Sequence, residues 1–301
     1  MIGNPFVRCK KAEYHAHGIL SASRSDIFKI NPGVLEVKSR FLGWDEFEDS
    51  VRNLLSSAWC VSNYCYYIKS AISNLVLDNV CYAELSFDLS DHLTLGIEFD
   101  CWLELIFREC QSHGESILIK PEIGLNARHG SEFYRPWFVA ACESGVFHSV
   151  DLYGNVNIDR ALEFKSFFTF AERSNLKKKA HLGEFNDCGS SLEFLKFVAL
   201  DEIQHGVSIL NSPVGFSILS KKRIPLNLSL SSNIALGVVY SFESYPFRRM
   251  LDKDLSFRLS TDDYLVFGRS ISDDAMAVCQ LGLLSQLEME AVLSKGVPLI
   301  P

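Results

Sequence analysis

Histidine and acidic side chains suited to metal-assisted hydrolysis recur in four short pieces of this sequence. Hydrolysis of an aromatic amine at neutral pH needs a metal that lowers the pKa of water from about 15.7 to about 7, and a carboxyl group that carries a proton. It also needs a further acid or base to steady the attacking oxygen. The pieces that hold such groups are His15-Ala16-His17, His181-Leu182-Gly183-Glu184, His205-Gly206 and Thr261-Asp262-Asp263.

Three imidazoles and one carboxylate make a site for zinc or a similar divalent cation, with one position left open. We expect the metal ligands to be His15, His17, His181 and Asp262. Glu184 would carry a proton from water to a ring nitrogen of the substrate, and His205 would orient the attacking oxygen. Asp263 would accept a hydrogen bond from that oxygen or from a purine nitrogen.

Each piece alone has a simpler interpretation. A His-x-His pattern on a strand often occurs without a metal, and His-x-x-Glu or Asp-Asp is commonly a helix cap or a solvated turn. The chain has only eight histidines, and half of them lie in these pieces while the others fit no such pattern. The conjunction therefore favours a metal site over four unrelated features.

The pattern of the rest of the chain predicts the elements that would position these groups. Short apolar runs rich in β-branched and aromatic residues alternate with stretches of helical periodicity, which is typical of βα units around a parallel sheet. Eight such runs predict an α/β fold, a single (β/α)8 TIM barrel with short inserted helices. The predicted strands are 11–16, 80–87, 116–125, 146–152, 178–182, 201–205, 224–229 and 255–261. The predicted helices are Asp45–Ser56, Trp102–Ser112, Arg135–Glu143, Arg160–Arg173, Ser190–Ala199 and Asp273–Leu293.

The four pieces fall at the carboxyl ends of predicted strands. In a parallel barrel these ends converge on one face, so residues far apart in sequence can meet around one ion. The two histidines of the first strand alternate along it, so both side chains point to the same side. In chain order the ends carry His15 and His17 on the first strand, His181 on the fifth, His205 on the sixth, and Asp262 and Asp263 on the eighth.

Composition bounds the class of protein. We expect one metal-dependent hydrolase domain over residues 1–301, because 48% hydrophobic and 22% charged residues supply a core and no stretch reads as a linker. A net charge of −8 disfavours a nucleic-acid polymer as partner, since binding its backbone needs a basic stripe. Lys177-Lys178-Lys179 is the densest basic run, and we expect it to be the solvated start of a strand rather than a phosphate site.

Targeting signals are missing from the sequence as given. The start of the chain lacks an apolar core of signal-peptide length, and no window approaches the roughly 20 apolar residues of a membrane span. We therefore expect a cytoplasmic protein with no membrane partner.

The sequence resembles the adenosine deaminase family of metal-dependent hydrolases over nearly its whole length. The segments that carry the resemblance are Glu13-Tyr14-His15-Ala16-His17, Tyr82-Ala83-Glu84-Leu85, Asp151-Leu152-Tyr153-Gly154, His181-Leu182-Gly183-Glu184, Gln204-His205-Gly206, Ser232-Asn233-Ile234-Ala235-Leu236-Gly237 and Ser260-Thr261-Asp262-Asp263. The resemblance implies a (β/α)8 barrel that holds one Zn²⁺ and deaminates a purine by hydrolysis at C6.

The resemblance also implies a role for each site residue. It places the metal on His15, His17, His181 and Asp262. It makes Glu184 the proton shuttle and gives His205 and Asp263 the task of setting the attacking oxygen. Gly154 would offer a backbone contact to the base.

The sequence departs from the family where the sugar would bind. After its metal-binding histidines the family usually has a polar residue that holds a sugar hydroxyl, followed by glycine. Here the chain runs His17-Gly18-Ile19-Leu20. Ile19 cannot accept a hydrogen bond, so we expect an altered sugar, or none, to suit this pocket better than ordinary ribose.

The function expected from the sequence is zinc-dependent hydrolytic deamination of the C6 amino group of an adenine-containing small molecule, releasing ammonia. The substrate would be adenosine or a modified adenine nucleoside or nucleotide. A free-base aminohydrolase, acting on adenine or a pterin-type base, is an alternative. A noncatalytic relative that binds a purine is disfavoured because a binder gains nothing from Glu184. A phosphoesterase would need a second metal near the fourth strand, where Val150-Asp151 offers one carboxylate.

Overall fold

A nearly closed parallel barrel forms the centre of the protein. The computed structural model describes residues 3–32, 40–112, 116–155 and 157–298. Its eight strands form one sheet in chain order, each parallel to the next. A parallel bridge between Ala16 and Asp262 joins the first strand to the segment that follows the last one. The strands are β1 (Lys11–His17), β2 (Val80–Asp88), β3 (Leu118–Asn126), β4 (Ser149–Tyr153), β5 (Lys177–Leu182), β6 (Glu202–His205), β7 (Leu226–Leu228) and β8 (Phe257–Leu259).

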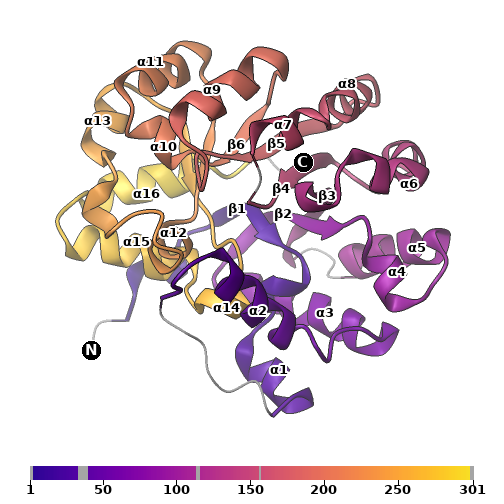
Figure 1. Cartoon of the computed structure of the whole chain (residues 1–301). Coiled ribbons are helices and arrows are strands. Elements are labelled where there is room, and N and C mark those ends of the chain that lie inside the picture. The colour runs from indigo at the N-terminus through magenta and orange to yellow at the C-terminus, as the bar shows by residue number, and fades with distance from the viewer. Residues whose placement is uncertain (1–2, 33–39, 113–115, 156, 299–301) are drawn as a thin grey trace.

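Helices surround these strands, as Figure 1 shows, and cover the barrel with apolar side chains. The α-helices are α1 (Arg24–Ile30), α2 (Trp44–Leu54), α3 (Val61–Leu77), α4 (Asp91–Leu95), α5 (Phe99–Gln111), α6 (Ser131–Glu143), α7 (Ile158–Leu162), α8 (Lys165–Arg173), α9 (Cys188–Phe197), α10 (Val207–Leu210), α11 (Pro213–Lys222), α12 (Leu230–Ala235), α13 (Phe247–Asp252), α14 (Tyr264–Phe267), α15 (Ile271–Gln280) and α16 (Gln286–Lys295). Short 3-10 helices are η1 (Pro5–Arg8), η2 (Ile19–Ser21), η4 (Ala127–His129) and η5 (Phe242–Ser244). Within the described residues, no helix has the length and apolar character needed to cross a bilayer.

All eight predicted strands are present, which confirms the predicted (β/α)8 barrel. Two helix predictions need correction. The predicted helix 160–173 is two helices, α7 and α8, and the predicted helix 273–293 is likewise divided into α15 and α16. The long helix α3 was not predicted from the sequence.

The basic run of β5 is not a solvated lead-in, and that prediction was wrong. Lys179 is fully buried inside the barrel, where its ammonium group contacts Glu84 and lies 2.6 Å from Glu122 and 3.7 Å from Glu202. A buried ammonium group is tolerated because these carboxylates compensate its charge. Lys179 and these three carboxylates thus form a buried ion cluster inside the barrel, below the carboxyl ends of the strands.

Candidate metal centre and active site

The histidine and acidic residues singled out in the sequence converge at the carboxyl end of the barrel. Strands β1, β5 and β6 supply the histidines, and the segment that follows β8 supplies the two aspartates. Glu184 lies in the loop between β5 and α9. His15 and His205 are fully buried, while the side chain of His17 keeps 14% of its surface exposed. The arrangement places all of these groups at the inner end of one pocket or directly beneath it.

The carboxylate of Asp262 lies close to two of the histidines, His15 and His17. Its Oδ1 atom lies 3.4 Å from Nε2 of His15 and 3.4 Å from Nε2 of His17. Its Oδ2 atom accepts a hydrogen bond of 2.6 Å from the hydroxyl of Ser232. Ser229 Oγ lies 3.1 Å from Nδ1 of His15, so the opposite nitrogen of that ring is free to face Asp262. The serines therefore fix the orientation of the carboxylate and of one imidazole.

Glu184 lies between the other two histidines. Its Oε2 atom is 3.5 Å from Nε2 of His205 and 3.6 Å from Nδ1 of His181. The two rings are also in contact, with 3.2 Å between His205 Nε2 and His181 Nδ1. Nδ1 of His205 lies 2.9 Å from Oδ1 of Asn233, which fixes the plane of that ring. A carboxylate in this position can exchange a proton with a group bound in the pocket.

Three overlapping groups of these residues are compact enough to hold a metal ion. In each group the ligand atoms lie within 4.8 Å of one another; the groups are His15, His181 and His205, then His15, His17 and Asp262, then Glu184, His205 and Asp262. His181 belongs to the group that contains His15 and His205. Its Nε2 atom lies 3.3 Å from Oδ2 of Asp151.

The donor set fits a divalent cation. Nε2 of His15 is buried, and no hydrogen-bond partner for it is found among the described residues. An orphaned buried nitrogen is unfavourable in an apoprotein, and a bound cation would satisfy it. Burial, and then the charge of His181, lower the pKa of His15 well below its usual value and that of His17 to about 3. Both rings are therefore neutral, which is the protonation state that binds metals.

The pKa values of the other two histidines are shifted in opposite directions. Burial lowers the pKa of His205 to about 4 despite the nearby Glu184. Burial also disfavours the charged form of His181, but Asp151 and Glu184 outweigh it and raise its pKa to about 10. Burial, followed by the charge of Glu184, raises the pKa of Asp262 to about 7. The site is thus a compact set of titratable groups with shifted pKa values, as expected of a functional site.

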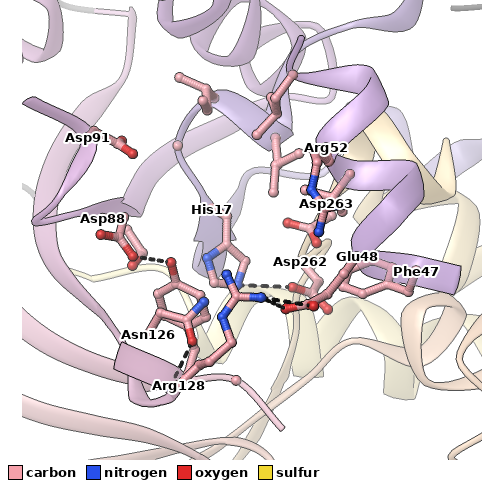
Figure 2. Close-up of a pocket in the computed structure, with 18 of the residues that line it drawn as sticks. His17, Phe47, Glu48, Arg52, Asp88, Asp91, Asn126, Arg128, Asp262 and Asp263 are labelled. Atoms are coloured by element: carbon pink, nitrogen blue, oxygen red, sulfur yellow. Dashed lines mark hydrogen bonds and ion pairs between the residues drawn. The ribbon is translucent and has the colours of Figure 1, made fainter. Parts of the chain in front are cut away.

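A cavity of about 310 Å³ opens above these residues and leads to the surface. Figure 2 shows His17 and Asp262 at its inner end, with Asp88 and Asp91 on one side and Glu48 on the other. Its wall includes all three residues expected to contact substrate, namely Ile19, Gly154 and Asp263.

Those three residues offer different surfaces to a ligand. Ile19, in η2, is 7% exposed and presents only carbon. Asp263 is 3% exposed, and its Oδ1 atom has no hydrogen-bond partner among the described residues. Gly154 has φ 106°, and an added Cβ would lie 2.8 Å from Oδ1 of Asn126, so only glycine fits there. A flat ring can therefore approach the backbone at Gly154.

Sequence reasoning missed the residues that support the histidines. Asp151, Ser229, Ser232 and Asn233 each contact one of the site residues. Three of them lie in segments that carry the family resemblance, which was the available signal. Their contacts could not be foreseen, because each joins residues of different strands or loops.

Comparison with known proteins identifies the family of this chain. The family model described as adenosine deaminase matches residues 29–296, which include every site residue from Gly154 to Asp263. The chain belongs to the adenosine deaminase family. It is accordingly a metal-dependent aminohydrolase.

Members of this family and similar folds can be named. The chain is 29% identical to a putative adenosine/adenine deaminase of Treponema pallidum, over 94% of this chain and 96% of that protein. It is 27% identical to an adenine deaminase of Chlorobium phaeobacteroides, over 74% of this chain and 66% of that protein. The apo structure of the N6-methyl-AMP deaminase from Arabidopsis thaliana has the same fold, with a TM-score of 0.83 and 20% identity over 96% of this chain and 91% of that one.

Proposed function

We propose that this protein catalyses the zinc-dependent hydrolytic deamination of the C6 amino group of an adenine-containing small molecule. The substrate would be adenosine or a modified adenine nucleoside or nucleotide. The observation that carries the proposal is the position of Glu184, which contacts His181 and His205 where the pocket ends. A purely binding protein has no use for a carboxylate placed between two imidazoles. Relatives named as adenosine or adenine deaminases support the same reaction.

We assign the cation to His15, His17, His181 and Asp262. Three imidazoles and one carboxylate are a ligand set that zinc accepts with a position left open. The contacts of Asp262 with two histidines support the assignment. The buried Nε2 atom of His15, which has no hydrogen-bond partner within the described part of the chain, supports it too. When bound, such an ion supplies Lewis acidity that lowers the pKa of water to about 7.

The protein side chains handle the protons of the reaction. Water adds to C6 of the ring, and Glu184 carries a proton from that water to the neighbouring ring nitrogen. The C6–N bond then breaks as the hydroxyl on C6 gives up its proton to the amino group, so that ammonia leaves and a carbonyl forms at C6. His205, fixed by Asn233, orients the attacking oxygen. Asp263, whose Oδ1 atom is buried and has no hydrogen-bond partner among the described residues, accepts a hydrogen bond from that oxygen or, when protonated, donates one to a ring nitrogen of the purine.

A free-base aminohydrolase is the second candidate function. Ile19 favours it, because an apolar wall replaces the hydrogen-bond acceptor that a ribose hydroxyl would need. The same site chemistry would serve both substrates, since the reacting C6 atom belongs to the base.

Release of ammonia by the purified, metal-replete protein tests the proposal. The substrates are adenine, adenosine, deoxyadenosine and AMP, with guanosine as a purine that carries no amino group at C6. We expect ammonia from at least one adenine compound and none from guanosine. Failure of every adenine compound would overturn the proposed function.

A further inference from the structure

An ion pair spans the entrance of the pocket. Glu48 lies on α2 and Arg128 on η4, and both side chains line the cavity. Nη1 of Arg128 donates to Oε1 of Glu48 at 2.8 Å and to Oε2 at 3.0 Å, as Figure 2 shows. Both carboxylate oxygens therefore face the same guanidinium nitrogen.

This pairing occupies the arginine that is best placed to bind an anion in the pocket. A second arginine of the lining, Arg52, contacts Asp49 Oδ1 at 2.9 Å. Among the described residues that line the cavity, each arginine is thus matched by a carboxylate. A phosphate bound near Arg128 would have to displace Glu48 or lie beside its negative charge, and like charges in such proximity are strongly unfavourable.

The facing wall is also unsuited to an anion. Asp91 accepts a hydrogen bond of 2.6 Å from Tyr64, and Asp88 accepts one of 2.8 Å from the amide of Ser90. Burial, and then the nearby charge of Asp88, raise the pKa of Asp91 well above its usual value. Surroundings that disfavour the charged form of Asp91 also disfavour a bound phosphate, because both groups are anions. Carboxyl oxygens suit hydroxyl and amino donors instead.

We propose that Glu48, by pairing with Arg128, makes this site select an adenine base or nucleoside over a 5′-monophosphate. The inference rests on the proposed function and refines it to a substrate class. Glu48 is a specificity-determining residue in this view, and it takes no part in the chemistry.

The alternative role of the pair is mechanical. A contact between α2 and η4 could simply hold the entrance in shape. A mechanical role predicts that loss of the pair changes the use of every substrate by the same factor. Selection by charge predicts that it changes the monophosphate alone.

The test is Glu48→Gln, which keeps the shape of the side chain and removes its charge. The matched control is Glu132→Gln, because Glu132 forms the same kind of pair with Arg135 on the surface of α6, away from the cavity. kcat/KM is measured for AMP and for the better of adenine and adenosine. Binding of inosine and IMP is measured by calorimetry, which needs no turnover.

We expect the parent protein to use the uncharged substrate at least about tenfold better than AMP. Glu48→Gln should raise kcat/KM for AMP at least about tenfold, through KM, and change the uncharged substrate less than about threefold. It should strengthen the binding of IMP but not that of inosine. The control should leave all of these values unchanged.

Two results would overturn this inference alone. One is a parent protein that prefers AMP, and the other is a Glu48→Gln variant in which both substrates change by the same factor. If no adenine compound releases ammonia, the proposed function fails, and the calorimetry decides the inference separately. IMP bound more tightly than inosine by the parent protein would then overturn it.

Discussion

His205 and Asp262 share a left-handed backbone conformation, each with φ 63°, and their side chains face each other, with 4.0 Å between Nε2 and Oδ2. This conformation is uncommon for residues other than glycine and costs on the order of 1–3 kcal/mol. Each residue lies where its chain leaves the barrel, after β6 and after β8. Asp262 contacts both histidines from β1, and the ring of His205 lies 4.6 Å from the ring of His15. The strained backbone positions therefore coincide with the site.

Metal content is the first property to measure. We expect about one divalent ion per chain, because His15 and His17 are held neutral beside one carboxylate. His17→Ala should lose the ion and lower the melting temperature, since binding to the folded state alone stabilises it. His129→Ala, at an exposed histidine that belongs to none of the candidate metal groups, should keep the ion. Elemental analysis that finds no transition metal in unchelated parent protein would contradict the assignment.

Glu184→Gln should keep the metal and lose at least about 100-fold in kcat, because a proton shuttle contributes roughly 10²–10⁴. The structure removes the alternative that Glu184 caps a helix. Helix α9 begins at Cys188, and its N-cap is Asp187, which accepts a hydrogen bond of 3.1 Å from the amide of Ser190. Asp187→Ala should therefore lower the stability of the protein with little change in rate. A Glu184→Gln variant with nearly normal turnover would remove the assigned role.

Asp151→Asn should weaken metal binding or activity by about 10- to 100-fold, as expected for a group that orients a ligand. Asp151 is fully buried, and its Oδ2 atom lies 3.3 Å from Nε2 of His181. Competition with a chelator gives the metal affinity. Because this carboxylate is the main cause that raises the pKa of His181, its loss should lower that pKa and move the pH profile of metal binding to lower pH. An unchanged affinity together with an unchanged profile would show that the contact is only structural.

Ile19→Asp should raise the use of adenosine relative to an analogue whose sugar lacks the hydroxyl or is absent. An unmade buried hydrogen bond costs about 1–3 kcal/mol, or roughly 5- to 150-fold in kcat/KM. In the parent protein we expect adenosine to be the poorer of the two substrates, because Ile19 lines the pocket with carbon alone. If the parent already prefers adenosine and Ile19→Asp lowers its use, other residues hold the sugar.

The barrel could be predicted because its signal is local. Each strand is a short apolar run of its own, and the order of eight runs defines the topology. The division between α15 and α16 also had a local signal that the prediction overlooked. Gly282 has φ 69°, and Ser285 with Glu288 forms a capping box at the start of α16.

Helix α3 was harder to predict. Its buried residues lie mainly on one face, but Val76 and Leu77 place apolar side chains off that face. Its tyrosine, isoleucine and valine content also suits a strand, so periodicity alone does not decide. The contact between Asp151 and His181 had no sequence signal at all. It depends on the pairing of β4 with β5, which brings the two side chains together from separate strands.

The origin of the oxygen in the product tests the hydrolytic deamination most directly. The purified metal-replete protein is incubated with the best adenine compound of the screen in water labelled with heavy oxygen. We predict that the product carries one labelled oxygen at C6 and that ammonia appears in equal amount, with both lost in Glu184→Gln. A product without the label, or no product from any adenine compound, would contradict the proposed reaction.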